Sequence, residues 1–242
     1  MALTAAAQRA APPATARNRT RMPELYDSLY RLGYQSDGIM THYGPVLRAL
    51  EPLVALEKID TVLDVGSSHG GGVSAMWKMG VRASGVDVAP AAVALAESKY
   101  GAEPSRCVAK CWTAAPATSL PFDDRAFDAL VSTDVLEHLA EEDVERAVEE
   151  LGRVTSRWML LKISNRHETT RMETTRSPFG RGTYAGDAWA RFNVTVPRHL
   201  HTAVHNQSWW VARFERAGFR YNATIRVASW ACCAFILERR LL

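Results

Sequence analysis

The sequence predicts an α/β fold, in which short apolar strands alternate with helices, and two stretches carry that prediction. Residues 61–73 open with an apolar run that ends near Asp64, break into a loop of glycine and serine, and lead into a helix through Lys78. Residues 81–87 form a second short apolar strand, which ends in Asp87. A strand, a tight turn and a helix in this order bring backbone N–H groups and a helix N-terminus beside a bound ligand.

The loop after the first strand has the pattern Gly66-x-x-x-Gly70, and it contains Ser67 and Ser68. Glycine suits such a loop because it adopts positive φ angles and because a side chain would block the close approach of a ligand. The pattern is not the full dinucleotide-binding fingerprint, and many glycine clusters are ordinary turns. The loop alone is therefore compatible with a ligand site and with a simple turn.

Asp87 favours the ligand site. It follows Gly70 by 87 − 70 = 17 positions, close to the separation of about 20 expected for an acidic residue that binds a ribose diol. A second role for Asp87, as the N-cap of the helix predicted over residues 90–100, is compatible with the first. Asp64 lies where it can meet an amine or a hydroxyl of a nucleoside.

Four motifs in order resemble those of class I S-adenosylmethionine-dependent methyltransferases, and most closely the small-molecule branch called type 11. They are residues 61–73, 85–88, 120–128 and 129–139. The resemblance, which runs from about Thr61 to the C-terminus, implies a Rossmann-like, seven-stranded, mostly parallel sheet flanked by helices. It also implies an N-terminal helical cap and a long insertion after strand five.

The resemblance further implies that the chain is an enzyme that binds S-adenosyl-L-methionine and methylates an acceptor. The cofactor-binding residues that it implies are Asp64, Gly66, Ser67, Ser68, Gly70, Asp87, Val88, Ala117 and Thr133. Two departures from the family pattern matter. Ser68 stands where glycine is usual, and Pro116 stands where an aspartate often precedes the Leu-Pro-Phe triplet, so we expect looser or backbone-based recognition of adenine.

The composition is that of an ordinary globular protein. The chain has 242 residues, 47% of them apolar and 23% charged, with a net charge of +3. So small a basic excess makes nucleic acid an improbable partner, and no apolar run reaches the roughly 20 residues of a membrane span. The four cysteines have no metal-ligand spacing, and the adjacent pair Cys232 and Cys233, in an apolar strand, is expected to pack in the core. A reducing compartment is the simplest inference. The sequence carries no indication of oligomeric state.

Residues 1–21 are rich in alanine, threonine and proline, contain several arginines and no acid, and are expected to be a disordered or targeting tail. We expect a cytoplasmic protein, with an organelle as the alternative if the tail is a transit peptide. Residues 22–56 follow as a helical cap or lid, and residues 57–242 as the methyltransferase domain.

The cap contains Tyr26, Tyr30 and Tyr34 at a spacing of four, which places them on one face of a helix. Tyr43 precedes a second helix, predicted over residues 45–56, with proline in its first turn. Two readings stay open: the tyrosines pack on the sheet as core, or, as the family resemblance suggests, the cap is a lid whose Tyr34 or Tyr43 touches the acceptor.

The later elements follow from apolar runs and helical periodicity. We predict strands over residues 105–110, 126–132 and 157–163, and an amphipathic helix over residues 141–151. Asp134 and His138 follow the fourth strand and are the first candidates for a catalytic base or an acceptor contact. The alternatives are that Asp134 caps the next helix and that His138 is structural.

The insertion, residues 165–198, has few helix or strand signals, and long loops of this kind are usually functional or disordered. Its arginines suit an anionic group, so we expect Arg191, Arg198, His199 and His201 to contact a small, negatively charged acceptor. His199, His201 and His205 lack an added carboxylate, which makes them a weak ligand set, and we predict no metal site.

The C-terminal part is predicted to contain a helix capped by Ser208 and stopped by Gly218, and then two strands over residues 219–227 and 230–238. Two other functions remain open. A non-catalytic S-adenosylmethionine-binding subunit would keep the glycine loop and Asp87 but lack an acceptor pocket. A nucleic-acid or protein methyltransferase would use the insertion as its binding surface.

Overall fold

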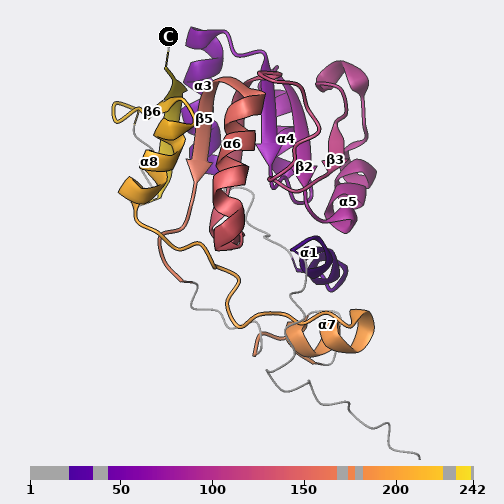
Figure 1. The fold of residues 1–242 in the computed structure, drawn as a ribbon. Coiled ribbons are helices and arrows are strands. Elements are labelled where there is room, and N and C mark those ends of the chain that lie inside the picture. The colour runs from indigo at the N-terminus through magenta and orange to yellow at the C-terminus, as the bar shows by residue number, and fades with distance from the viewer. Residues whose placement is uncertain (1–21, 35–42, 168–173, 178–181, 226–232, 241–242) are drawn as a thin grey trace, which may run out of the picture.

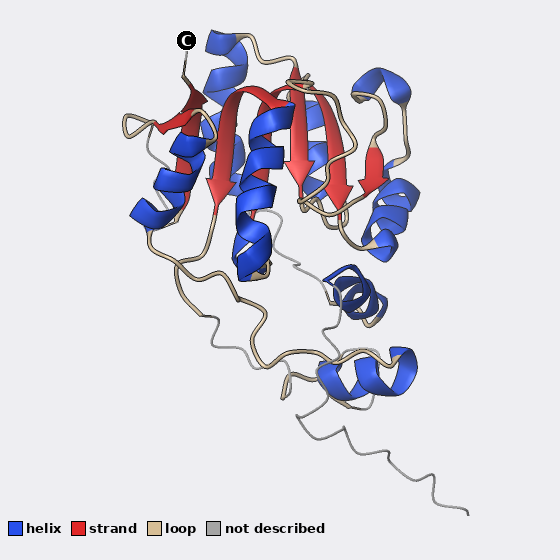
Figure 2. Cartoon of the chain, viewed as in Figure 1, coloured by secondary structure: helices blue, strands red, loops and turns tan. Residues whose placement is uncertain are grey.

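The computed structural model describes residues 22–34, 43–167, 174–177, 182–225 and 233–240. The predicted tail, residues 1–21, lies outside these ranges, as do Gly38, residues 168–173 of the insertion and Cys232. In the described part, seven strands form one sheet in the order β3-β2-β1-β4-β5-β7-β6 (Figure 2). The seven-stranded Rossmann-like fold that the resemblance implied is confirmed.

The strands alternate with helices along most of the chain. The strands are β1 (Thr61–Val65), β2 (Arg82–Asp87), β3 (Trp112–Ala114), β4 (Phe127–Thr133), β5 (Thr155–Lys162), β6 (Phe219–Tyr221) and β7 (Ala234–Arg239). Strands β1 to β5 pair in parallel, and β7 pairs antiparallel with both β5 and β6.

The α-helices of the described part are α1 (Met22–Arg31), α3 (Gly44–Glu57), α4 (Gly71–Lys78), α5 (Pro90–Tyr100), α6 (Val144–Val154), α7 (Tyr184–Phe192) and α8 (Gln207–Arg216). Short 3-10 turns η1 (Pro104–Arg106), η2 (Leu136–His138) and η3 (Glu141–Asp143) join them.

Alternating strand residues face two separate hydrophobic layers, as the pleat of a sheet requires. Leu63 and Leu130 face a core that includes Val148 of α6 and Phe214 of α8. Val62 and Leu160 face the other core, which α3, α4 and α5 cover. A sheet buried on both faces exposes ligand-binding groups only at its edges, and Figure 1 shows the arrowheads of the parallel strands pointing toward α1 and α7, whereas β7 runs the other way.

The third strand lies later in the chain than predicted. Residues 105–110 were expected to be extended, but Pro104–Arg106 is a 3-10 turn and the strand begins at Trp112. Cys107 and Cys111 form a disulfide, with Cα atoms 5.0 Å apart, and Ala109 between them has φ 58°. This closed turn cannot be a strand. Cys107 and Cys111 are both buried in the hydrophobic core, and the bond between them was not predicted.

The insertion contains a helix that its sequence signals did not predict. The Thr183 side chain accepts a hydrogen bond from Gly186 N and caps α7, which ends at Asn193 with φ 54°. Tyr184 and Ala188 of α7 pack on Leu25 and Leu29 of α1, together with Val194 and Leu200. The insertion therefore covers the outer side of the cap helix, and the third hydrophobic cluster joins the two (Figure 1).

The side of α1 that faces away from α7 is hydrogen-bonded to the main domain. Asp27 accepts a hydrogen bond from Ala91 N at 2.7 Å, at the N-terminus of α5. Helix α1 thus lies between α5 and α7, which is the position expected of a cap.

The C-terminal elements are shorter than predicted, and their cap differs. Asn206, and not Ser208, caps α8, because its side chain accepts from Trp209 N at 2.9 Å. Ser208 donates to Asn206 Oδ1 instead. Strand β6 lies within the first predicted segment, and β7 overlaps the second and ends one residue beyond it, at Arg239. Residues 226–232 between them lie outside the described part.

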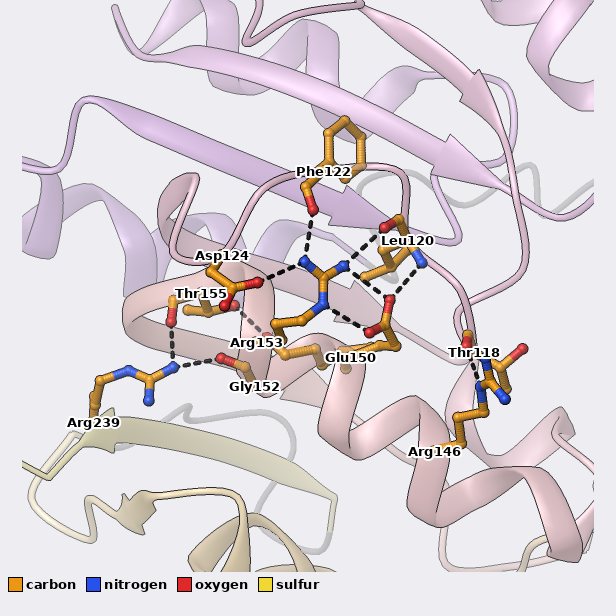
Figure 3. A network of polar contacts seen from close by, with 11 residues as sticks. Thr118, Leu120, Phe122, Asp124, Arg146, Glu150, Gly152, Arg153, Thr155 and Arg239 are labelled. Carbon is orange, nitrogen blue, oxygen red and sulfur yellow. Dashed lines mark hydrogen bonds and ion pairs between the residues drawn. The ribbon is translucent and has the colours of Figure 1, made fainter.

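One arginine anchors the loop between β3 and β4 (Figure 3). Arg153 of α6 donates to Leu120 O at 2.9 Å and to Phe122 O at 2.7 Å, and it pairs with Glu150 and Asp124. Glu150 in turn accepts from Leu120 N at 2.7 Å. The planar guanidinium suits such a multiple contact. These contacts hold the β3–β4 loop in place, and with it Ala117, which lies at the carboxyl edge of the sheet.

Candidate functional site

A cavity of about 680 Å³ lies at the carboxyl ends of β1, β2, β4 and β5, beneath α1. Its walls come from the glycine loop, from the segment after β3, from the segment after β4 and from the tyrosines of the cap. Ligands of open α/β sheets bind at this edge. The structure therefore brings most of the predicted site residues to one cavity.

The glycine loop forms one wall. Gly66 has φ 78° and lines the cavity, and a Cβ there would collide with the side chain of Val135. Ser68, with φ 48°, also lines the cavity. Gly70 has φ 78° too, but a Cβ there would come within 2.5 Å of the Trp112 ring. Gly70 and the buried Ser67 thus shape the loop from behind, outside the cavity wall.

Asp87 holds the loop and the next helix together. Its Oδ2 accepts from Ser68 N and its Oδ1 from Ala89 N, both at 2.9 Å. Only 6% of Asp87 is exposed, and burial raises the pKa of its carboxyl to about 6. Asp87 is not the N-cap of α5, because Ala89 occupies that position and no side chain caps the helix; Asp87 instead binds the N–H of Ala89 just before it. Because each carboxylate oxygen has two lone pairs, Asp87 keeps acceptor capacity toward the cavity that it lines.

Asp64 is buried behind the cavity. It is fully shielded from solvent, it accepts from the Tyr43 hydroxyl at 3.1 Å, and a Cβ on Gly72 would come within 2.7 Å of its Oδ2. Burial raises the pKa of Asp64 to about 8. It does not line the cavity, so in this structure it reaches the site only through Tyr43.

The remaining predicted cofactor contacts lie where they were expected. Val88 follows β2, Ala117 lies after β3, and Thr133 ends β4, and all three line the cavity. Pro116 and Ala117 supply an apolar surface to the cavity. Pro116 therefore offers no carboxylate at the position where the family often has an aspartate.

The three tyrosines of the cap point to the cavity. Tyr26 and Tyr30 lie on α1, Tyr34 follows it, and all line the cavity together with Tyr43. Their rings make edge-to-face contacts, Tyr30 with His69 at 5.1 Å and Tyr26 with His138 at 5.9 Å between centroids. Burial raises the pKa of Tyr26 and of Tyr30 above the usual value of a phenol. Both phenols are therefore neutral donors at neutral pH.

Charged groups gather at the opposite end of the cavity. Lys162 Nζ, at the end of β5, lies 2.6 Å from Asp134 Oδ2. Asp134 has φ 54°, a left-handed conformation that aspartate tolerates better than most residues. Glu137, in the turn after it, is wholly buried, and burial, with the negative Asp134 nearby, raises the pKa of Glu137 to about 8. Sequence reasoning missed both residues, although Glu137 lies in the motif over residues 129–139 and Lys162 ends the predicted fifth strand.

The insertion residues divide into two groups. His201 lines the cavity beside His138, with ring centroids 4.7 Å apart. Arg191 and Arg198 are exposed and His199 is half-buried, and none of them lines the cavity. Arg171 and Arg181 lie outside the described residues. Of the predicted acceptor contacts, the structure thus brings together Tyr34, Tyr43 and His201.

Comparison with known proteins agrees with this arrangement. Residues 63–157, from β1 to β5, match the model of the methyltransferase domain family. This match identifies the segment that contains the glycine loop, Asp87 and the turn after β4 as an S-adenosylmethionine-dependent methyltransferase domain. Its cofactor is S-adenosyl-L-methionine, as the motifs after β1 and β2 implied. No curated protein sequence matches the chain.

Solved methyltransferase structures share the fold across nearly the whole chain. Magnesium protoporphyrin IX methyltransferase from Synechocystis PCC 6803, with bound S-adenosylhomocysteine, is 15% identical, with 89% of this chain and 94% of that one covered and a TM-score of 0.55. Burkholderia thailandensis 1,6-didemethyltoxoflavin-N1-methyltransferase is 15% identical, with 98% of this chain and 95% of that one covered and a TM-score of 0.54. A chain of a Haloferax volcanii complex between a methyltransferase activator and a methyltransferase gives 16%, 90%, 97% and 0.55.

In the part of the chain that the structure describes, no helix is long and apolar enough to cross a membrane.

Proposed function

We propose that the methyltransferase transfers the methyl group of S-adenosylmethionine to a small molecule held beneath α1. The observation that carries this proposal is the single cavity that runs from Gly66 and Asp87 to His138 and Lys162 under the tyrosines of the cap. Its volume of about 680 Å³ falls within the range of roughly 300–1,000 Å³ typical of small-molecule sites. Because the same cavity has to hold the cofactor, the remaining space suits a small acceptor.

The cofactor belongs at the glycine-loop end. Gly66 and Ser68 leave room for a ligand to approach the backbone, and Asp87 has lone pairs for the ribose hydroxyls. Val88 and Ala117 offer apolar surface for the adenine, and Thr133 marks the middle of the cavity. The methyl group would then project toward the end that His138, His201 and Tyr34 line.

The acceptor end is aromatic on one side and charged on the other. Tyr26, Tyr30 and Tyr34 offer ring edges and hydroxyl donors, which suit a planar acceptor. The negative charge expected of the acceptor draws no support from Arg191 or Arg198, which are exposed outside the cavity. Its support comes from Lys162, which lines the cavity and whose ammonium group also pairs with Asp134.

The chemistry asks little of the protein beyond alignment. The sulfonium already activates the methyl group, so holding the acceptor oxygen, nitrogen or carbon in line with it supplies most of the acceleration. Asp134 is engaged by Lys162 at 2.6 Å, which makes it a poor base. His138 is the better candidate, because its Nδ1 lies 3.2 Å from Leu200 O and therefore carries the proton, leaving the lone pair on Nε2.

The test uses cofactor labelled in its methyl group and a pool of low-molecular-weight metabolites. We expect a labelled small product, and we expect Tyr34→Ala to raise the acceptor KM at least several-fold with little change in the affinity for S-adenosylhomocysteine. The matched controls are Arg191→Gln and Arg198→Gln, which remove exposed side chains and should leave acceptor kinetics unchanged.

Two outcomes would overturn the proposal. Label transferred only to RNA or protein would mean a macromolecular acceptor. Tight binding of S-adenosylmethionine without any product from metabolites, RNA or protein would mean a cofactor-binding subunit without activity. If the two arginine variants raise the KM and Tyr34→Ala does not, the acceptor binds at the insertion and not in the cavity.

A further inference from the structure

Three side chains with metal-binding groups converge at the charged end of the cavity. Glu137 and His138 belong to η2, directly after β4, and His201 lies on the segment that returns from the insertion. One potential ligand atom from each lies within 4.8 Å of those of the other two. Two ligands of one cation lie at most about 4.2 Å apart, since each bond is about 2.1 Å long, so a small closure of the side chains brings the three into range.

The backbone fixes this arrangement. Thr202 N and Ala203 N both donate to Glu137 O, at 2.8 and 3.0 Å, and Thr202 Oγ1 donates to Leu139 O at 2.6 Å. These bonds hold the segment that carries His201 against η2. The cluster is therefore a product of the fold and not of long, freely rotating surface side chains.

Both histidines are oriented as metal-binding histidines are. Nδ1 of His138 lies 3.2 Å from Leu200 O, and Nδ1 of His201 lies 2.7 Å from Arg166 O. A carbonyl oxygen only accepts, so Nδ1 donates in each ring, and in the neutral ring Nε2 carries the lone pair. A backbone carbonyl behind the ring is the usual arrangement that fixes the tautomer of a histidine ligand.

One carboxylate oxygen of Glu137 is buried without a hydrogen-bond partner among the described residues. The side chain is 0% exposed; its Oε1 accepts from Ser164 N at 3.0 Å, whereas its Oε2 accepts no hydrogen bond from any described residue. A buried polar atom without a partner is unfavourable. A cation at the centre of the cluster would supply the missing partner.

We propose that Glu137, His138 and His201 bind one divalent transition-metal ion whose open coordination positions face the cavity. Two imidazoles and one carboxylate form a set that suits ions such as Zn²⁺ and Mn²⁺. His138 and His201 line the cavity, so the open positions are available to an oxygen of the acceptor. With the ion bound, Nε2 of His138 is a ligand and no longer a base, and the ion would engage the acceptor oxygen in its place. This last role rests on the proposed function, whereas the binding of the ion does not. Because the carboxylate comes from η2, the site differs from the histidine set rejected on sequence grounds.

The test is calorimetric titration of the full chain, freed of metal with a chelator, with MnCl₂ and separately with ZnCl₂, in the absence of cofactor and acceptor. We expect at least one of the two ions to bind at one per chain. His201→Ala and Glu137→Gln should each weaken that binding tenfold or more. The matched control is His205→Ala, which removes a histidine from the same segment that pairs with Glu141 and stacks on Trp209 outside the cavity.

The thermal midpoint of each metal-free variant shows whether it is folded, and His138→Asn replaces Glu137→Gln if the latter is not. Failure of both ions to saturate a single site would overturn the proposal. So would equal losses in His201→Ala and His205→Ala, which would mean non-specific binding to surface histidines. The titration does not measure methyl transfer, so it tests the metal site even if the proposed acceptor is wrong.

Discussion

At the scale of single residues, Asp87 is the side chain on which we expect cofactor affinity to depend most. Its carboxylate already accepts hydrogen bonds from Ser68 N and Ala89 N, so it also stabilises the local fold besides the expected ribose contact. Asp87→Ala should weaken the binding of S-adenosylmethionine by about 1.5–3 kcal/mol, typical of hydrogen bonds to a charged group. Calorimetry measures this, and Asp87→Asn, which keeps one acceptor oxygen, is the control for the lost hydrogen bonds from Ser68 N and Ala89 N. Unchanged affinity in a folded Asp87→Ala variant would contradict the assignment.

Asp64 leads to a prediction about pH. Its pKa is raised to about 8 by burial, against about 3.9 in an unfolded chain. The folded state therefore holds a proton that the unfolded state has lost, so this group's contribution to stability is full below about pH 4 and declines as the pH rises toward 8. Asparagine does not ionise, so the thermal midpoint of apo Asp64→Asn minus that of the wild type should increase as the pH rises from 5 to 8.

The control for that measurement is Glu97→Gln, which neutralises an exposed carboxylate of α5. A difference between Asp64→Asn and the wild type that stays constant from pH 5 to 8, or that Glu97→Gln reproduces, would show that Asp64 is already ionised in the folded protein.

At the scale of elements, helix α1 is held at both sides and forms the roof of the site. Its apolar side packs on α7 through Leu25 and Leu29, and Asp27 accepts Ala91 N at 2.7 Å. Asp27→Ala removes the acceptor at the start of α5, an effect of about 0.5–2 kcal/mol. We expect faster amide hydrogen exchange over residues 25–32, with Asp27→Asn, which can still accept, close to the wild type. Equal exchange in all three proteins would mean that packing on α7 alone holds the cap.

The elements also show how far sequence reasoning reaches. Strands β1, β2, β4 and β5 and helix α6 were predictable because long apolar runs and periodic apolar positions specify burial. Helix α7 was not, because only Tyr184 and Ala188 are fully buried and the helix depends on packing against α1. The start of β3 was misplaced because the disulfide between Cys107 and Cys111 closes a turn that composition does not reveal.

At the site itself, the motif residues after β1, β2 and β4 were predictable because their neighbours along the chain determine their position. Arg191 and Arg198 show the limit: an arginine-rich stretch predicts an anion site only if the chain folds it inward, and both side chains lie on the surface. Glu137 and His201 are far apart in sequence and meet through hydrogen bonds of the returning segment. No local pattern specifies such a meeting.

At the scale of the whole molecule, one edge of the sheet receives every group that the proposed reaction needs. The carboxyl ends of β1, β2 and β4 supply the cofactor side, β5 supplies Lys162, and the tyrosines of the cap cover the cavity from outside. Arg153 stiffens the β3–β4 segment from the side of α6 (Figure 3). The fold thus converts residues dispersed along the chain into one enclosed site.

The most direct test of this account is a crystal structure of the chain with S-adenosylhomocysteine. We expect the ribose hydroxyls within hydrogen-bonding distance of the Asp87 carboxylate, the adenine against Val88 and Ala117, and the sulfur facing the end of the cavity that His138 and Tyr34 line. A nucleoside bound outside this cavity, or a ribose that does not contact Asp87, would contradict the account.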